Sequence, residues 1–189
     1  MNNQVLRTIF ERRSCRSYDA EKKVSEQDLV TVLKAGAYAP SAMNTQSWHF
    51  TAVVNKDALT KLNAAMLESL PQEVRERIEA RADGKTPSPF YNAPALIIVS
   101  LKEGASVYPE ADAACALQNM FLAATSLHLG TCWINQLRGK TPDDTPLGTL
   151  LGQLGVPQGN IVYGCCALGY ADKESPMKDR VSGVVNIVK

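Results

Sequence analysis

Residues 95–101, Ala-Leu-Ile-Ile-Val-Ser-Leu, form an apolar run near the middle of the chain. A run of this kind is typical of a β-strand that is buried on both faces of a sheet. Similar runs predict strands at 48–54 and 161–168, and shorter strands are expected at 132–134 and 184–188. Together with residues 95–101, these expected strands predict a central β-sheet.

The segments between these runs have the spacing of helices. Apolar residues between Val5 and Phe10 recur every three or four positions, which predicts a helix over residues 3–13. Ser25 is a candidate N-cap for a second helix, which ends before Pro40 because the residue preceding a proline avoids the helical region. Further helices are expected at 57–70, 72–82 (charged, and interpreted as a solvated face), 111–129 and 147–154. This order indicates an α+β fold with a central sheet flanked by helices.

Composition narrows the class of protein. The 189 residues are 45% hydrophobic and 21% charged, which suits one globular domain over residues 1–189. The net charge of +1 argues against a nucleic-acid-binding protein. No apolar signal segment stands at the N-terminus, and the uncharged stretch 113–137 holds too many polar residues for a membrane span. Five cysteines without a Cys-x-x-Cys motif indicate reduced thiols and a cytoplasmic location, and two histidines give no support for a metal site.

The expected 111–129 helix is apolar on most sides but carries a polar seam. The seam consists of Asp112, Gln118, Asn119, Thr125 and Ser126. Two explanations are open: the seam faces a partner subunit or a ligand, or its polar groups are satisfied within the chain.

The 83–94 segment is expected to be a loop because it holds three prolines and a glycine. Phe90 and Tyr91 lie in it. This aromatic pair is either a lid that faces a substrate or an anchor that holds the loop against the core. The sequence does not decide between these roles, and it leaves the role of Tyr108 open as well.

A second conspicuous stretch is Arg12-Arg13-Ser14-Cys15-Arg16, called the arginine segment below. It brings three guanidinium groups and a hydroxyl together at the end of the first expected helix. Arginine pairs bidentately with phosphate oxygens and stays charged at any working pH. An anionic ligand such as a phosphate ester therefore fits. The alternative is that these basic side chains stabilise the C-terminus of the helix.

Other motifs that would carry chemistry are missing from the sequence. No Gly-x-Gly-x-x-Gly follows an expected strand, and no phosphate P-loop occurs. His49 and His128 are expected to be packed rather than to act as bases, and no nucleophile–base pair stands out, so we expect no catalytic side chain. A chain with phosphate-binding arginines and no acid–base apparatus indicates a cofactor that carries the reaction.

Five motifs follow one another along the chain: Arg12-Arg13-Ser14-x-Arg16, Pro40-Ser41-x-x-Asn44-x-Gln46-x-Trp48-x-Phe50, Gly130-Thr131-Cys132-Trp133-Ile134, Leu154-Gly155-Val156-Pro157-Gln158-Gly159 with Leu168-Gly169-Tyr170, and Lys178-x-Arg180. In this order and spacing they resemble the signatures of the FMN-dependent nitroreductase family. The resemblance extends from about residue 5 to residue 182.

The resemblance implies a mostly antiparallel sheet and an obligate-type homodimer with FMN at the subunit interface. The arginine segment would hold the phosphate, ribityl chain and pyrimidine edge, and Lys178 and Arg180 would close on the phosphate. The 40–46 segment would come from the second subunit, and the backbone of 133–136 would face the reactive nitrogen of the flavin. The cofactor-binding residues implied in this way are Arg12, Arg13, Ser14, Arg16, Pro40, Ser41, Asn44, Gln46, Trp133, Ile134, Asn135, Gln136, Lys178 and Arg180.

The resemblance also implies a reaction. NADH or NADPH would reduce FMN by hydride transfer and leave, and a nitroaromatic compound, a quinone or a similar electron-poor acceptor would then take two electrons in a ping-pong cycle. The alternatives are a flavin carrier or sensor without efficient turnover, and a relative that acts in dehalogenation or flavin breakdown. Two departures stand out: Ser47 occupies a position where many members have proline, and Asn135-Gln136 replaces a Glu-Gly or Gly-Gly pair.

Overall fold

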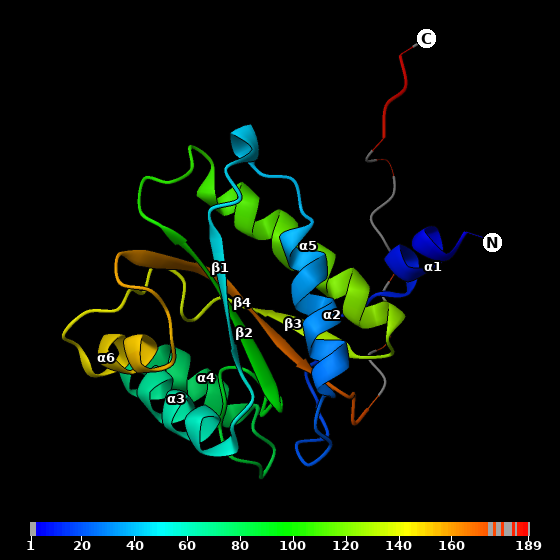
Figure 1. Cartoon of the computed structure of the whole chain (residues 1–189). Helices are drawn as coiled ribbons and strands as arrows, with labels where there is room; N and C mark the ends of the chain where they lie inside the picture. The colour runs from blue at the N-terminus through cyan, green and yellow to red at the C-terminus, as the bar shows by residue number, and fades with distance from the viewer. Residues whose placement is uncertain (1–2, 174–175, 177–178, 180–182, 184, 189) are drawn as a thin grey trace.

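An antiparallel β-sheet forms the centre of the molecule (Figure 1). The computed structural model describes residues 3–173, 176, 179, 183 and 185–188. Within them, four strands pair in the order β1-β2-β4-β3, and every neighbouring pair is antiparallel. The strands are β1 (Trp48–Val53), β2 (Ala95–Lys102), β3 (Gly130–Ile134) and β4 (Asn160–Gly169). The predicted α+β fold and mostly antiparallel sheet are confirmed.

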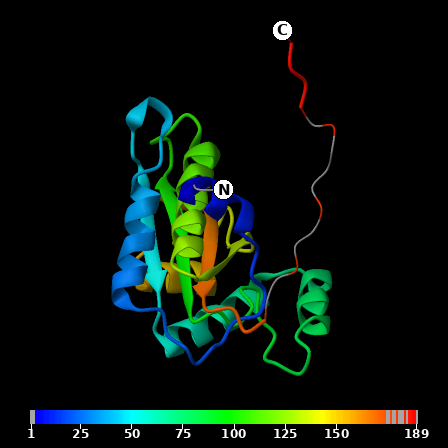
Figure 2. The ribbon, with the colours of Figure 1, turned by 90° about the vertical axis from the view of Figure 1, so that its right-hand side faces the viewer.

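Helices cover both faces of this sheet (Figure 1). On one face, α2 and α5 pack on side chains such as Ile97 and Val99, and on the other, α3 and α6 pack on Leu96 and Ile98. Helix α4 stands to one side of the molecule (Figure 2). The helices are α1 (Gln4–Glu11), α2 (Glu26–Ala37), α3 (Lys56–Ser69), α4 (Gln72–Ala80), α5 (Pro109–Ser126) and α6 (Pro146–Gln153), with a short 3-10 turn, η1 (Ala42–Asn44). No helix in the described ranges has the length and hydropathy that a bilayer crossing requires.

Most predicted elements form within a few residues of their expected bounds, but two predictions were wrong. The strand expected at 184–188 is absent over its described part, 185–188, where Val185, Ile187 and Val188 are 74–89% exposed. This segment leads away from the sheet, so its β-branched residues have no neighbouring strand with which to pair (Figure 1). His49 and His128 were expected to be packed, but both are exposed.

Four of the five polar residues in the α5 seam form hydrogen bonds within the chain. Asp112 is 3% exposed and accepts hydrogen bonds from the Ala42 backbone at 2.8 Å and the Ser106 hydroxyl at 2.6 Å. The Asn119 side chain donates to the carbonyl oxygen of Ala35 on α2 at 3.1 Å. The Thr125 and Ser126 hydroxyls donate to carbonyls of their own helix. For these four residues, the explanation based on internal hydrogen bonds is the correct one.

Candidate functional site

The arginine segment lies along the outer edge of β3. The backbone N–H of Cys15 donates to the carbonyl oxygen of Thr131 at 2.8 Å, and Ser14 pairs with Thr131 in a parallel bridge. Two motifs far apart in the sequence, 12–16 and 130–134, are therefore joined through the backbone. The segment is thus fixed to the sheet, which holds its side chains at a defined edge of the molecule.

The arginine segment lies so close to β3 that only glycine fits at position 130 of the strand. A Cβ atom at Gly130 would lie 2.7 Å from the Cβ of Cys15, closer than real Cβ contacts allow. Farther along, the Tyr18 hydroxyl donates to the carbonyl oxygen of Ala167 at 3.2 Å in buried surroundings. The chain is consequently held to the sheet within the arginine segment and again two residues after it, and a larger residue at Gly130 would push the segment off the strand.

The positive charges of three arginines act on Cys132 of β3. Burial raises the pKa of the Cys132 thiol, and the positive charges of Arg16, Arg81 and Arg12 oppose that rise. Arg12 and Arg16 come from the arginine segment, whereas Arg81 follows the last residue of α4. The charges of two distant parts of the chain thus act on one position at the sheet edge.

A cavity of about 200 Å³ lies beside these arginines. Its basic side chains are Arg16, Arg81, Lys85 and Lys173, and we call it the basic cavity. Asp83 is the one acidic residue among its described lining residues. Lys85 also pairs with Asp172 at 3.4 Å. The excess of positive charge suits an anionic or electron-rich ligand.

Tyr91 connects the two main arginines of this cavity. The Arg81 guanidinium lies over its ring, 4.4 Å from the centroid, and donates to its hydroxyl at 3.3 Å. Burial lowers the pKa of Arg16, but the nearby Cys132 thiol and a hydrogen bond to Tyr91 give it a net rise. The sequence analysis assigned Arg81 to a solvated helix face and missed its place here. No local pattern signals it, because the contact depends on how the 83–94 loop folds back.

Arg13 has a different role from its neighbours. Its Nη1 atom donates to the carbonyl oxygens of Phe10 at 2.6 Å and of Arg12 at 2.8 Å, at the C-terminus of α1. This is the stabilising role at a helix end that the sequence analysis left open for the segment. The expectation that Arg13 binds a cofactor phosphate stays a prediction.

The far end of β3 carries the residues expected to face a flavin. Trp133 is 39% exposed and packs edge-on against Phe121 of α5 at 6.2 Å between ring centroids, while Ile134 is buried. The backbone N–H of Asn135 donates to the side-chain oxygen of Gln136 at 3.1 Å. This N–H can serve a ligand only if the Gln136 side chain turns away.

The 40–46 segment lies at the opposite end of α5 from the arginine segment (Figure 1). It is held over the start of that helix by the Ala42–Asp112 hydrogen bond, and α5 is 18 residues, or about 27 Å, long. Within the segment, the Gln46 N–H donates to the Ser41 hydroxyl at 3.0 Å and the Gln46 side chain to Asn44 at 2.9 Å. One chain does not bring these residues, or the exposed Pro40, to the basic cavity.

The remaining candidates divide into three groups. Phe90 is 2% exposed and belongs to the core, so it anchors the loop rather than covering a ligand, whereas Tyr108 is 67% exposed at the start of α5.

Lys178 and Arg180 lie outside the described residues. In the ranges that the structure does describe, no three His, Cys, Asp or Glu side chains gather in a way that could hold a metal ion.

Comparison with known proteins tests the resemblance stated above. The model of the nitroreductase family matches residues 9–170. A structure of a nitroreductase with bound FMN from Bacteroides fragilis shares 44% identity over 100% of both chains, with a TM-score of 0.84. A nitroreductase with bound FMN from Desulfitobacterium hafniense shares 27% identity over 100% of both chains, also with a TM-score of 0.84.

A third relative comes from Archaeoglobus fulgidus and carries the provisional name NADH dehydrogenase/NAD(P)H nitroreductase. It is 31% identical over 177 residues, which cover 90% of this chain and 87% of the relative. The predicted resemblance is thus confirmed over most of the chain, from helix α1 to the end of β4. On this ground, together with the fold described above, the chain belongs to the nitroreductase family.

Proposed function

We propose that this chain is an FMN-dependent oxidoreductase that takes hydride from NADH or NADPH and reduces an electron-poor acceptor such as a nitroaromatic compound or a quinone. The observation that carries the proposal is the arginine segment, fixed along β3 with the basic cavity beside it. The FMN in the B. fragilis and D. hafniense relatives and the names of the NAD(P)H nitroreductases support it. Five free cysteines agree with a cytoplasmic location, which is part of the proposal.

The arginine and serine side chains at the sheet edge are hydrogen-bond donors that suit FMN. In this proposal Arg12 and Ser14 hold the phosphate and the ribityl chain, and Arg16 and Arg81 face the electron-rich pyrimidine edge. Guanidinium groups suit both tasks because they form charge-assisted hydrogen bonds in a fixed fork. When bound, FMN supplies the two-electron chemistry that no side chain of this site offers. The half-exposed Trp133 beside β3 would shield the ring from water on one side.

An anaerobic absorbance spectrum tests the activity. We expect the purified protein to show a flavin spectrum that bleaches on addition of NADH or NADPH and returns on addition of a quinone or a nitroarene. Steady-state oxidation of the nicotinamide then measures turnover, and a parallel-line dependence on the two substrates would support the ping-pong order. A flavin that neither nicotinamide reduces would contradict the proposal and favour a carrier or sensor.

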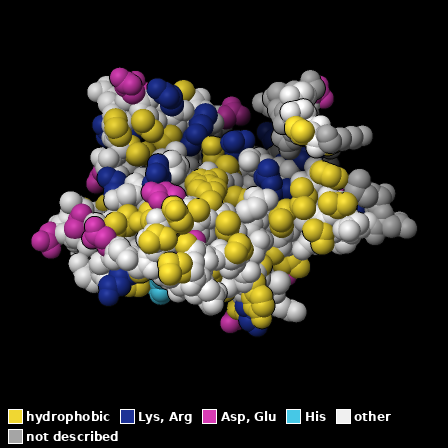
Figure 3. Space-filling model, turned by 90° about the horizontal axis from the view of Figure 1, so that it is seen from above, with side chains coloured by type: hydrophobic (Ala, Val, Ile, Leu, Met, Phe, Trp, Pro, Cys, Tyr) yellow, Lys and Arg dark blue, Asp and Glu magenta, His cyan; other side chains and the backbone are white. Residues whose placement is uncertain are grey.

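We further propose that the site is shared between two copies of the chain. On α1, Val5 is 64% and Phe10 56% exposed, and Tyr38 and Met43 beside η1 are each 87% exposed. The face drawn in Figure 3 carries hydrophobic side chains across much of its width. Exposed apolar surface of this extent is typical of an interface. A homodimer would cover it and bring the 40–46 segment of one copy to the arginine segment of the other. The α5 seam gives little support here, since four of its five polar residues form hydrogen bonds within the chain.

Two measurements test this assembly. Light scattering is expected to give twice the chain mass of 20.5 kDa. A mixed dimer then tests the shared site: one chain carries Arg12→Ala with Arg16→Ala, and the other carries Ser41→Pro with Asn44→Leu. A shared site leaves one FMN per mixed dimer, although each parent dimer lacks it. A mixed dimer without flavin would show that each site is built from a single chain.

A further inference from the structure

The 83–94 loop holds two neighbouring residues in an unfavourable backbone conformation. Tyr91 has a φ of 61° and Asn92 a φ of 56°, both in the left-handed region. A bulky side chain rarely adopts this conformation, and it persists only where the surrounding structure enforces it. Because strain of this kind gathers at functional sites, the position of Tyr91 needs a functional explanation.

Contacts around the loop enforce the strained conformation. Phe90 is 2% exposed and lies in the core. The Asn92 side chain donates to a carbonyl oxygen earlier in the loop at 2.8 Å, and the Asn63 side chain of α3 donates to the carbonyl oxygen of Pro87 at 2.9 Å. With Phe90 held in the core, the left-handed residues turn the next ring away from it. Tyr91 consequently lines the basic cavity.

The Tyr91 side chain contacts both main arginines of the basic cavity. The Arg81 guanidinium lies 4.4 Å from the centroid of the Tyr91 ring, and its Nη1 atom donates to the hydroxyl at 3.3 Å. Its Nη2 atom donates to the carbonyl oxygen of Ser88 at 3.3 Å, which fixes the plane of the guanidinium. Arg16 of the arginine segment also forms a hydrogen bond to Tyr91. The phenol therefore joins two cations that come from distant parts of the chain.

The Tyr91 hydroxyl keeps its hydrogen for a ligand. A phenol oxygen accepts through its lone pairs and donates one hydrogen bond, whereas a guanidinium group only donates. Arg16 and Arg81 therefore use the oxygen of Tyr91 and leave its hydrogen, and the side chain donates to no described residue. The basic cavity thus offers one neutral donor beside two cationic donors.

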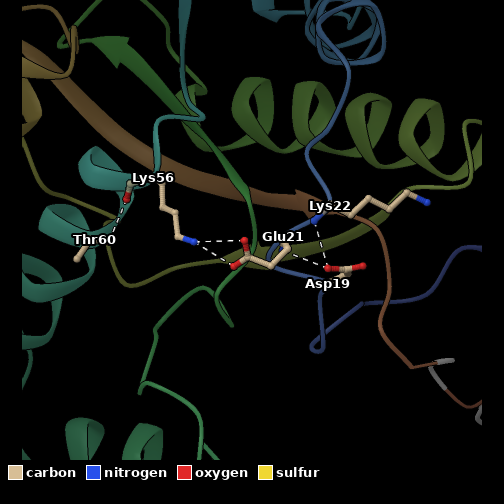
Figure 4. Close-up of polar contacts among 5 residues, drawn as sticks. All are labelled: Asp19, Glu21, Lys22, Lys56 and Thr60. Carbon is tan, nitrogen blue, oxygen red and sulfur yellow. Dashed lines mark hydrogen bonds and ion pairs between the residues drawn. The ribbon is translucent and has the colours of Figure 1, made fainter.

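The chain that follows Arg16 is also held in place. Asp19 accepts from the backbone N–H groups of Glu21 and Lys22 at 3.1 and 3.2 Å, which closes a turn. The Lys56 ammonium of α3 contacts the Glu21 carboxylate at 3.0 Å and joins this turn to the helix (Figure 4). Both parts of the chain that carry the donors are therefore attached to the body of the protein, as a preorganised site requires.

We propose that Tyr91 raises the reduction potential of the bound FMN, because it positions Arg16 and Arg81 and donates its own hydroxyl hydrogen to the pyrimidine edge. This inference rests on the proposed function. Hydride transfer adds two electrons and one proton to the flavin, so the reduced form carries one more negative charge, which is delocalised over the pyrimidine ring. Hydrogen bonds to a charged acceptor are roughly twice as strong as neutral ones. The three donors consequently stabilise the reduced form more than the oxidised form.

The midpoint potential of Tyr91→Phe tests the proposal, because this variant keeps the ring and removes the hydroxyl. We expect it to lose about tenfold more affinity for reduced FMN than for oxidised FMN, since the lost bond is charge-assisted only in the reduced form. That ratio lowers a two-electron midpoint potential by about 30 mV. Fluorescence titration measures the affinity for oxidised FMN, and anaerobic equilibration with a redox dye measures the potential.

Tyr170→Phe is the matched control. The Lys22 ammonium lies over the Tyr170 ring at 3.8 Å from the centroid, much as Arg81 lies over Tyr91. Tyr170 is not among the described residues that line the basic cavity. Its substitution removes a phenol hydroxyl near a cation as well, but the midpoint potential should equal that of the wild type.

A double-mutant cycle with Arg81→Ala shows whether Tyr91 acts through the guanidinium group. The potential shift caused by Tyr91→Phe should be smaller without Arg81, because residues in contact are coupled. If Tyr91→Phe fails to fold, Arg81→Lys keeps the charge, loses the fork and should also lower the potential. An unchanged potential in Tyr91→Phe, or additive shifts in the cycle, would overturn this inference alone. Wild-type protein that never binds flavin would overturn the proposed function together with it.

Discussion

Two cavities share the 83–94 loop: the basic cavity and a second one of about 290 Å³, which we call the apolar cavity, and Thr86 and Asn92 contribute to both. Adjacent aromatic residues divide between them, since Tyr91 lines the first and Phe90 the second. The basic cavity gathers four cations from three separate parts of the chain. The apolar cavity is lined mostly by hydrocarbon surface, from residues such as Val54, Leu59 and Phe90. The comparison shows that one loop can contribute to a positively charged cavity and to an apolar one. Removing positive charge should therefore affect ligand binding only in the basic cavity.

The largest expected effect comes from removing two arginines together. Arg12→Ala with Arg16→Ala should weaken FMN binding about 10²- to 10⁴-fold, because each charge-assisted hydrogen bond contributes about 1.5–3 kcal/mol. The flavin-to-protein ratio after gel filtration, followed by FMN titration of the product, measures this. Arg7→Ala with Arg77→Ala removes the same charge from exposed helix positions and should keep its flavin. A double variant of the arginine segment that purifies fully loaded would end the assignment.

The second effect concerns two fully buried thiols in the core, one on each face of the sheet. Burial raises the pKa of the Cys165 and Cys166 thiols. Above pH about 8.5 the unfolded chain releases thiol protons that the native state keeps, so stability is complete below that pH and declines above it. Each thiol should cost up to about 1.4 kcal/mol per pH unit.

Urea unfolding between pH 7.5 and 10 measures this decline, which Cys166→Ala should reduce. Cys115 is only partly buried, and Cys115→Ser serves as a control that also removes one thiol. This measurement distinguishes flavin loss that is caused by missing arginines from flavin loss that is caused by unfolding. Release caused by removed arginines occurs at neutral pH in a folded protein, whereas alkaline release should follow unfolding. A flat stability profile up to pH 10 would contradict the assigned cause.

A third prediction sharpens the boundary of the basic cavity. Arg81→Ala should weaken FMN binding about tenfold, since it removes one cationic donor and loosens Tyr91. Arg77→Ala, one turn earlier on α4, should change the dissociation constant less than twofold. Fluorescence titration of flavin-free protein compares the two. Equal affinities would assign Arg81 a structural role in the loop alone.

The smallest effect is expected for Arg13→Ala. Because Arg13 Nη1 bonds to carbonyl oxygens at the end of α1, its loss should cost about 1 kcal/mol of folding free energy and change FMN affinity less than threefold. Thermal unfolding measures the change in stability, and FMN titration of the same preparation measures the change in affinity. An affinity loss as large as that of Arg16→Ala would instead make Arg13 a direct ligand.

The sequence predicts much of this molecule because its signals are local. The apolar runs identified all four strands of the described sheet, and Ser25 caps α2 through its hydroxyl at 3.0 Å from the Asp28 N–H, as expected. The strand expected at 184–188 does not form over its described part, 185–188, because strand formation needs a neighbouring strand as well as β-branched residues. Arg81 and Asn63 were missed for a similar reason. Each matters only through partners brought close by the loop, and neither stands in a pattern along the chain.

The attachment of the arginine segment to the sheet has a consequence for biosynthesis. The Tyr18 hydroxyl bonds to a residue 149 positions later in the chain, and the Ser17 hydroxyl to one 155 positions later. A ribosome adds about 5 to 20 residues per second, so roughly 7 to 30 s pass between synthesis of Tyr18 and synthesis of β4, the strand to which its hydroxyl bonds and with which β3 pairs. During that time the nascent chain lacks the sheet edge on which the site is built. Cofactor uptake is thereby deferred until translation is nearly complete.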